Sequence, residues 1–179
     1  MKFCDKFACS ITRFDHDSWQ ENQDWCLKHN QVCIYNSSMP MAASIAHVPY
    51  IFVVEMNYKS KKIIGVGLVL NKIVNDRRYN IYKDNARNTF TYKSNARMAK
   101  VDFSREEMET IEELEILLFT GYGHFVRGIG FSKLPDKITH IKGLVGNLKN
   151  PRVVKTYVNN YVRFFTKAFS RHYGERLAI

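Results

Sequence analysis

The sequence has no long apolar run, and none of its hydrophobic stretches approaches the roughly 20 residues that a membrane-spanning helix needs. Its first residues, MKFCDKFACS, also lack the apolar stretch of about 7–15 residues that marks a secretory signal. Only nine Gly and four Pro occur in 179 residues, which leaves little room for long flexible linkers. These absences predict a cytoplasmic or nuclear protein that folds as one domain over residues 1–179.

Cysteine is absent after position 33, and the spacings of the four that occur are C-x4-C and C-x6-C. Neither spacing matches the C-x2-C knuckles that hold structural zinc, although His16 and His29 lie nearby in the sequence. Reduced, buried thiols are the expected state in an intracellular protein. The sequence therefore predicts no metal site and no cofactor.

Charge of one sign dominates two long regions. Residues 59–101 carry eleven Lys and Arg against two Asp, and residues 120–179 repeat that balance. Between them, residues 102–119 hold seven acidic side chains and one Arg, and the whole chain has a formal net charge of +10. Clustered Lys and Arg gain free energy by displacing counterions from phosphates, so this pattern predicts a polyanionic partner. The prediction requires these cations to converge on one face rather than pair with the glutamates of 106–115.

Carboxylates are scarce in the two basic regions, which contain only four. No D-x-D or E-x-K pairing marks a metal nuclease, and no H-x-E with P-C-x-x-C marks a deaminase. The sequence therefore predicts no catalytic residue.

Hydrophobic periodicity predicts an α+β fold with a mostly antiparallel or mixed sheet. The short return at residues 57–62 disfavours an all-parallel sheet, whose crossovers are longer. We expect strands over residues 6–13, 31–35, 50–56 and 63–70, with strand-like pieces around 79–82 and 90–93.

Three helices are expected. The run Asp15-His16-Asp17-Ser18 predicts the start of the first helix, with a capping box at Ser18 and Glu21 or, one residue earlier, at Asp17 and Gln20. The S-x-x-E pattern at residues 104–107 predicts the start of the second. Asn150 and Pro151 predict the start of a long C-terminal helix, which Gly174 ends. The first two helices should end near residues 30 and 120.

Glycine is concentrated at two places. Gly65 and Gly67 lie on the same face of a predicted strand, where missing side chains allow close approach of backbone or ligand. Residues 121–130 hold four Gly, which predicts either a tight turn or a loop whose amides meet phosphate together with His124 and Arg127.

Basic and aromatic side chains interleave over residues 77–97, a combination that single-stranded nucleic acids use. The alternative is a solvated strand face with its aromatics turned inward. The basic C-terminal helix is a second candidate surface. The predicted phosphate-binding residues are Arg77, Arg78, Lys93, Arg97, His124, Arg127, Lys142, Arg163 and Lys167.

Residues 9–70 resemble the opening of the PUA-like superfamily, in particular its EVE and YTH branches. The pieces CSITRF, SWQENQDWCLKHN, QVCIYNSS and YIFVVEMNYKSKKIIGVGLVL follow the family order of strand, Trp-rich helix, short strand with polar turn, and two further strands. The Trp that the family carries in the short strand is replaced by Ile34-Tyr35. The resemblance implies a small curved sheet or open β-barrel with flanking helices, and a pocket for a modified base. Its implied residues, which also combine aromatic rings with short polar groups, are Trp19, Trp25, Tyr35, Asn36, Ser37, Met56 and Asn57.

The later part of the sequence, rich in Asn, Lys, Tyr and Ile, is similar to proteins of large DNA viruses. Taken together, these features predict a non-catalytic module that binds nucleic acid, RNA rather than DNA, or an extruded base. A structural or viral assembly protein whose basic faces meet acidic protein surfaces is the first alternative, with a homo-oligomer or fixed partner. A nucleic-acid-processing enzyme whose carboxylates meet only in the fold is the second.

Overall fold

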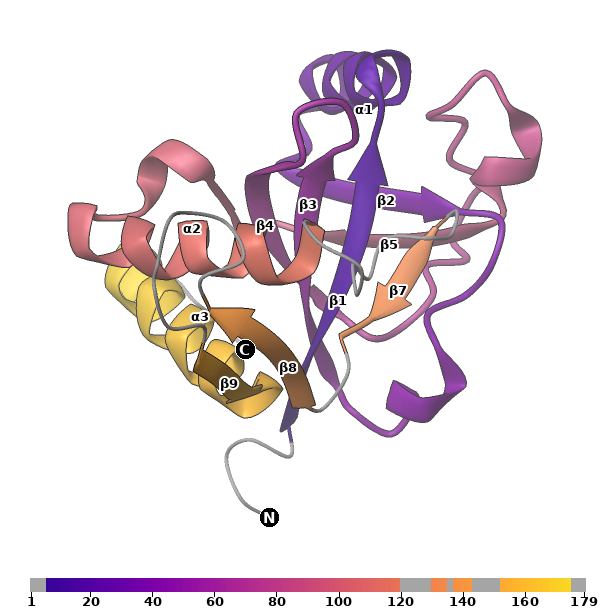
Figure 1. Ribbon diagram of the computed structural model, residues 1–179. Coiled ribbons are helices and arrows are strands. Elements are labelled where there is room, and N and C mark those ends of the chain that lie inside the picture. The colour runs from indigo at the N-terminus through magenta and orange to yellow at the C-terminus, as the bar shows by residue number, and fades with distance from the viewer. Residues whose placement is uncertain (1–5, 120–129, 135–136, 143–151, 175–179) are drawn as a thin grey trace.

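The computed structural model describes residues 6–119, 130–134, 137–142 and 152–174, the side chains of 137–142 and 152–158 excepted (Figure 1). The elements are β1 (Phe7–Phe14), α1 (His16–His29), β2 (Cys33–Ser37), η2 (Ala43–Ile45), β3 (Tyr50–Asn57), β4 (Lys62–Leu70), η3 (Asn85–Asn88), β5 (Phe90–Ser94), β6 (Arg97–Ala99), η4 (Lys100–Asp102), α2 (Arg105–Phe119), β7 (Phe131–Lys133), β8 (Lys137–Lys142), β9 (Arg152–Tyr157) and α3 (Val158–Tyr173), where η denotes a short 3-10 helix.

A five-stranded mixed sheet in the order β6-β4-β3-β1-β7 forms the centre of the fold. β1 runs parallel to β3, and β3 and β4 form the predicted antiparallel hairpin. β2 pairs with β5, and β8 with β9, in two small antiparallel sheets. The predicted α+β class, mixed sheet and long C-terminal helix are therefore confirmed, and the sheet does not close into a barrel.

Each face of the central sheet has its own apolar core. On β3, Phe52 and Val54 point to the core beneath α2 and α3, whereas Ile51 and Val53 point to the core beneath α1, β2 and β5. Successive side chains of a strand point to opposite faces, so one continuous apolar run serves both cores. The buried charged pair of Arg97 and Glu55 and its partner Tyr35 belong to the α1 face.

Capping boxes begin both α1 and α2. At α2, the Ser104 N–H donates to Glu107 Oε2 (2.7 Å) and the Glu107 N–H donates to Ser104 Oγ (3.2 Å), as predicted. The start of α1 falls within the predicted run of residues 15–18, but both predicted capping boxes are wrong, because Asp15 is the N-cap. There the Ser18 N–H donates to Asp15 Oδ1 (2.8 Å) and the Asp15 N–H donates to Ser18 Oγ (3.1 Å).

The start predicted for the third helix is also wrong. Residues 152–157 form β9, and α3 begins only at Val158. Two consecutive valines and a threonine in RVVKTY favour a strand, since β-branched side chains fit a pleated surface better than a helix. The end of the helix is as predicted, because Gly174 adopts a φ of 55°.

Residues 79–82 do not form the expected strand piece. The side chain of Asn88 takes up the backbone groups that a strand partner would have bound. Its Oδ1 accepts from the N–H groups of Ile81 (3.1 Å) and Tyr82 (3.0 Å), and its Nδ2 donates to the Tyr82 carbonyl (2.6 Å). One buried amide therefore folds residues 79–88 into a compact segment that ends in η3.

The C-terminal helix is fastened to the edge of the central sheet by a tyrosine. Tyr173 Oη accepts a hydrogen bond from the Arg97 N–H (2.7 Å) and donates one to the Arg97 carbonyl (2.6 Å). Neither α3 nor any other helix within the described ranges is long and apolar enough to cross a membrane.

Candidate functional site

Two surface hollows lie on either side of η3. The first, which we term the balanced pocket, has a volume of about 540 Å³ and is lined by Arg13, Asp15, Ser38, Tyr58, Asp84 and Arg87, among others. The second, which we term the cationic hollow, has a volume of about 510 Å³ and is lined by Asn75, Arg77, Arg78, Tyr79, Asn88 and Thr89, among others.

The balanced pocket forms where several strand ends meet. β1 and β3 are parallel, so both end at the same edge of the sheet, and the Tyr58 N–H bonds the Phe14 carbonyl there (2.7 Å). Asp15 follows β1 as the N-cap of α1, and Ser38 follows β2. The topology therefore brings polar side chains from three connections to one place, as at the carboxyl ends of other mixed sheets.

Positive and negative side chains are equal in number in the balanced pocket. Its two guanidinium groups lie on aromatic rings, Arg13 at 5.1 Å from the centroid of Tyr58 and Arg87 at 4.3 Å from that of Tyr82. Hydrogen bonds from the hydroxyl and the backbone N–H of Ser18 hold the pKa of Asp15 below its usual value, so this carboxylate is ionised. With Asp84, the lining carries two positive and two negative charges.

The lining of the cationic hollow contains two arginines and no carboxylate. Its nearest carboxylate, Asp76, accepts from the hydroxyl of Tyr79 (2.8 and 2.9 Å) and pairs with Lys93 Nζ (3.4 Å). These contacts, the Tyr79 bond first, lower the pKa of Asp76. Arg77 and Arg78 are exposed, and within the described residues neither side chain has a carboxylate partner.

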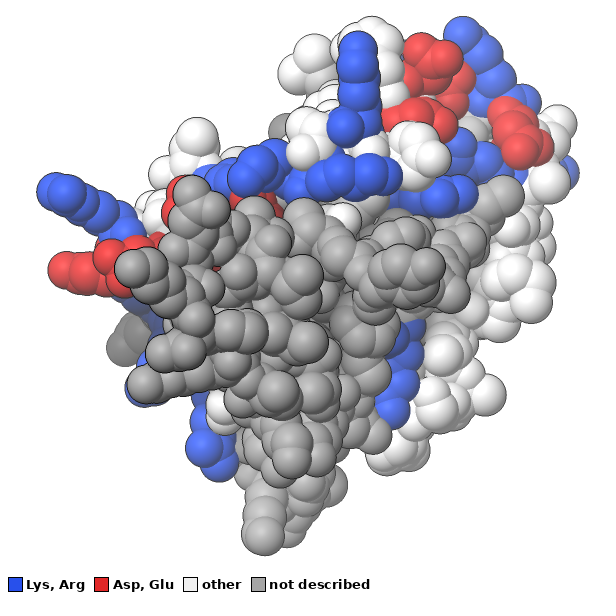
Figure 2. Space-filling view, viewed as in Figure 1, with Lys and Arg blue, Asp and Glu red and all other residues white. Residues whose placement is uncertain are grey.

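Figure 2 shows Lys and Arg gathered in the upper part of the view, where α1 and the η3 segment lie, with Asp and Glu among them. The basic side chains of α3 lie elsewhere, because α2 and α3 cover one face of the sheet whereas α1 and the η3 segment lie on the other (Figure 1). Glutamates of α2 also take up some cations: Glu115 pairs with Lys62 (2.9 Å) and Lys100 (2.6 Å). Among the residues that the structure describes, the cations therefore do not form the single face that the charge pattern of the sequence required for a polyanionic partner.

Asn36, in β2, contacts two residues that line the cationic hollow. Its Nδ2 donates to the Tyr79 carbonyl (2.5 Å) and to Asn88 Oδ1 (3.1 Å), which ties the end of β2 to the η3 segment. Only 7% of the residue is exposed, and its Oδ1 has no partner among the described atoms. The two donated bonds fix which way the amide faces.

The residues predicted for the base pocket do not gather into one cavity. Trp19 packs edge-on against Phe14 (5.2 Å between centroids), and Trp25 stacks on His29 (3.9 Å). Tyr35 and Ser37 are both 2% exposed and, like Asn36, belong to buried β2.

Met56 and Asn57 are likewise occupied elsewhere. Met56 is fully buried in the core under α2 and α3, and Asn57 Oδ1 caps the hairpin loop through the N–H groups of Lys59 and Ser60. The residues that reach the balanced pocket are the immediate neighbours Ser38 and Tyr58. Each of these two residues directly follows a residue that the sequence singled out, Ser37 and Asn57 respectively.

The predicted phosphate-binding residues divide into four groups. Arg77 and Arg78 line the cationic hollow, and Lys93 lies beside it on Tyr79 (Nζ to Oη 2.6 Å). Arg163 and Lys167 are exposed on α3, away from both hollows. His124 and Arg127 lie outside the described residues, as does the side chain of Lys142 in β8. Arg97 is the exception that the next paragraphs describe.

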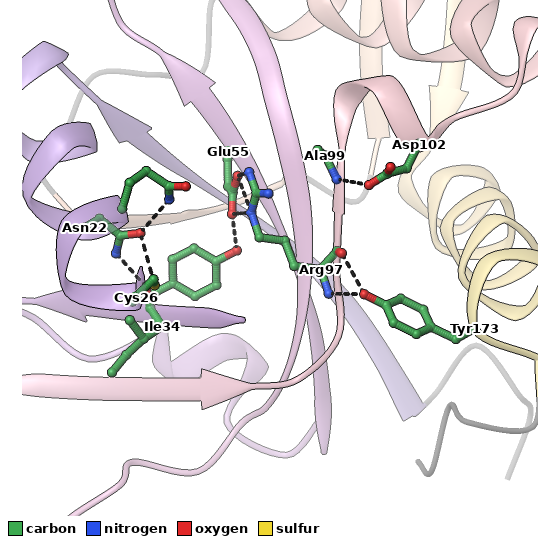
Figure 3. A network of polar contacts seen from close by, with 10 residues as sticks. Asn22, Cys26, Ile34, Glu55, Arg97, Ala99, Asp102 and Tyr173 are labelled. Atoms are coloured by element: carbon green, nitrogen blue, oxygen red, sulfur yellow. Dashed lines mark hydrogen bonds and ion pairs between the residues drawn. The ribbon is translucent and has the colours of Figure 1, made fainter. Parts of the chain in front are cut away.

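Arg97 belongs to a buried polar cluster on the α1 face of the sheet (Figure 3). Its guanidinium pairs with Glu55 (Nη2 to Oε2 2.6 Å, Nε to Oε1 2.9 Å), and the Tyr35 hydroxyl donates to the same carboxylate (2.6 Å). Side-chain exposure is 15% for Arg97 and 2% for Glu55. The ring of Trp19 covers the guanidinium at 5.4 Å.

Electrostatics and packing explain this cluster. Burial alone would lower the pKa of the Arg97 guanidinium, but the hydrogen bonds and charge of Glu55 have the larger effect and raise it. Burial also raises the pKa of the Tyr35 hydroxyl. The paired glycines of β4 make the room that the sequence indicated. A Cβ on Gly65 would lie 2.5 Å from Arg97 Nη2, and one on Gly67 would overlap the Tyr35 hydroxyl.

Cysteines 9, 26 and 33 are buried free thiols, and burial raises the pKa of Cys26 to about 11. Within the part of the chain that the structure describes, no three His, Cys, Asp or Glu side chains could share a metal ion. Comparison with protein-family models, curated proteins and solved structures finds no match for this chain.

Proposed function

We propose that this protein binds single-stranded nucleic acid, RNA in preference to DNA, and receives one nucleoside in the balanced pocket. The observation that carries the proposal is the composition of that pocket, which combines two guanidinium groups, two carboxylates and an aromatic ring in one hollow. A nucleoside matches this set, since it has a flat ring and both donors and acceptors along its edges.

The size of the pocket supports this ligand class. Its volume of about 540 Å³ lies within the range of roughly 300–1,000 Å³ that holds small organic ligands. A base would stack on a guanidinium plane, or on Tyr58 once the side chain of Arg13 or Lys61 leaves its ring. Asp15 and Asp84 would accept from the amino group of the base. The resemblance of residues 9–70 to EVE and YTH domains points to the same turn after β2, where Ser38 lies.

Binding rather than catalysis fits the two carboxylates. Asp15 accepts from the Ser18 N–H (2.8 Å) and Asp84 from the Ala86 N–H (3.0 Å), so each already stabilises a local turn. Carboxylates fixed in this way hold a ligand's donors without moving.

Fluorescence polarisation with labelled single-stranded RNA and DNA of equal length, at two salt concentrations, tests the proposal. We expect tighter binding to RNA, affinity that falls steeply with salt, and a loss of about tenfold or more in Arg87→Ala. The matched control is Arg163→Ala, which removes the same charge from exposed α3. A flat salt response, or equal losses in the two variants, would contradict the proposal.

A further inference from the structure

The cationic hollow is chemically different from the balanced pocket although the two share η3 as a wall. We infer that the cationic hollow binds a phosphate group of the strand whose nucleoside occupies the balanced pocket. This inference rests on the proposed function and assigns a separate site to the flanking backbone.

The charge of the hollow carries the inference. Two arginines line it and no carboxylate does. The adjacent Asp76 is engaged by the Tyr79 hydroxyl and Lys93, so it does not neutralise either guanidinium. An unmatched pair of guanidinium groups is the arrangement that recognises phosphate, because their N–H groups bond its oxygens two at a time.

The hollow is also held in place before any ligand arrives. The Arg77 guanidinium lies 4.9 Å from the centroid of the Tyr79 ring, and that ring is fixed through its hydroxyl by Asp76 and Lys93 (2.6 Å). Asn88, another lining residue, makes four hydrogen bonds to its surroundings, including that from Asn36. A binding site built on such a fixed wall loses little conformational entropy when it is occupied.

The position of the hollow connects it with the balanced pocket. Arg87, near the end of η3, lines the balanced pocket, whereas Asn88 and Thr89, the next two residues, line the cationic hollow. Arg87 and Asn88 are consecutive residues with Cα atoms about 3.8 Å apart, so the two hollows meet at η3. One or two nucleotides of an extended strand can therefore pass over η3 and reach both sites.

The double variant Arg77→Ala/Arg78→Ala tests the inference, with Arg163→Ala/Lys167→Ala as the control of equal charge. The probes are an uncharged nucleoside and a single-stranded RNA of about eight nucleotides. We expect nucleoside binding to be unchanged in both variants. RNA affinity should fall about tenfold in the hollow variant alone, and the slope of log K against log salt should become shallower by about 0.7 for the phosphate lost.

A third variant, Arg77→Lys/Arg78→Lys, keeps the charge and should keep most of the salt slope. Thermal unfolding of all variants should coincide with that of the wild type, since the replaced side chains are exposed. An RNA that still binds the wild type but shows the same salt slope in the hollow variant would overturn this inference alone. Absence of RNA and nucleoside binding by the wild type would overturn both it and the proposed function.

Discussion

Arg97 and the pair Arg77 and Arg78 lie in the same basic stretch of sequence but in opposite environments. The Arg97 guanidinium is buried on Glu55 beneath Trp19, with the Tyr35 hydroxyl on the same carboxylate. Arg77 and Arg78 are exposed and have no carboxylate partner among the described residues. The first arginine joins strands of the core, and the other two leave their charge open to solvent, where we propose that they bind an anion.

The difference shows that the position of a carboxylate, more than the density of basic residues, decides what an arginine can do. Glu55 lies on β3, 42 residues before Arg97. Its carboxylate meets the guanidinium next to Gly65 of β4, where the absence of a side chain leaves room for both groups. Asp76 precedes Arg77 directly, yet it bonds Tyr79 and Lys93. Neighbours in the sequence are therefore a poor guide to ion pairing here.

The largest effect should follow from removal of the buried carboxylate. Glu55→Ala leaves the Arg97 guanidinium buried without its counter-charge and the Tyr35 hydroxyl without its acceptor. We expect a loss of about 3–5 kcal/mol in the free energy of unfolding, measured with urea. Lys83→Ala, which removes an exposed partner of Glu21 at 3.8 Å, should give no measurable change. Equal losses would mean that the buried pair has no special role.

A smaller effect should follow from filling the space above β4. Gly67→Ala places a methyl group against the Tyr35 hydroxyl and Cys33 Sγ, and overpacking of this kind typically costs about 1–3 kcal/mol. The variant Gly67→Ala/Tyr35→Phe removes the obstructing oxygen. Its loss should be smaller than the sum of the two single losses, as a double-mutant cycle in denaturant would show. Additive losses would contradict the packing described here.

The smallest effect should be found at the exposed pair of Glu107 and Arg171 (2.7 Å). Burial alone would raise the pKa of Glu107, but hydrogen bonds from Arg171 and from the Ser104 N–H outweigh it and lower that pKa. Because the pKa of Glu107 is lower in the folded than in the unfolded protein, the carboxylate stabilises the fold at pH values above its unfolded-state pKa, near 4.3. This stabilisation is lost as the pH falls through the folded-state pKa.

Unfolding of Glu107→Gln and of the wild type as a function of pH measures this contribution. We expect a difference of less than about 1 kcal/mol at pH 7 that shrinks below about pH 4 and weakens with added salt. A difference in the free energy of unfolding that grows as the pH falls would show that the pKa of Glu107 is raised in the fold, not lowered.

The elements with a local signal could be predicted from the sequence. The hairpin at 57–62, the cap of α2 and the end of α3 at Gly174 each depend on residues close together in the chain. The α+β class followed from their order.

Two other segments were predicted wrongly. A side chain, that of Asn88, takes the backbone bonds of residues 81–82, which a strand pattern does not reveal. At residues 152–157 the helix-start signal of Asn150 and Pro151 favoured a helix, whereas the β-branched side chains and the pairing with β8 make this segment a strand.

The candidate site was predictable only in part. The sequence indicated the strand ends, but not that Ser38 and Tyr58, rather than Ser37 and Asn57, face the open side. A shift of one residue reverses the direction of a side chain in extended backbone. The predicted phosphate-binding role of Arg77 and Arg78 stays a prediction, although both are exposed and line a hollow, while Arg97 could not be told apart from them without its distant carboxylate.

The two hydrogen bonds of Tyr173 have a consequence for association between molecules. Its hydroxyl occupies both the N–H and the carbonyl of Arg97 on the outermost strand, β6, and so imitates one residue of a further strand. An open strand border invites pairing with another polypeptide, and this side chain closes it at that residue. Tyr173→Phe would leave the backbone N–H and carbonyl of Arg97 open on the edge of β6. We expect this variant to self-associate in light scattering and, because Arg97 also pairs with Glu55, to destabilise the buried cluster at the same time.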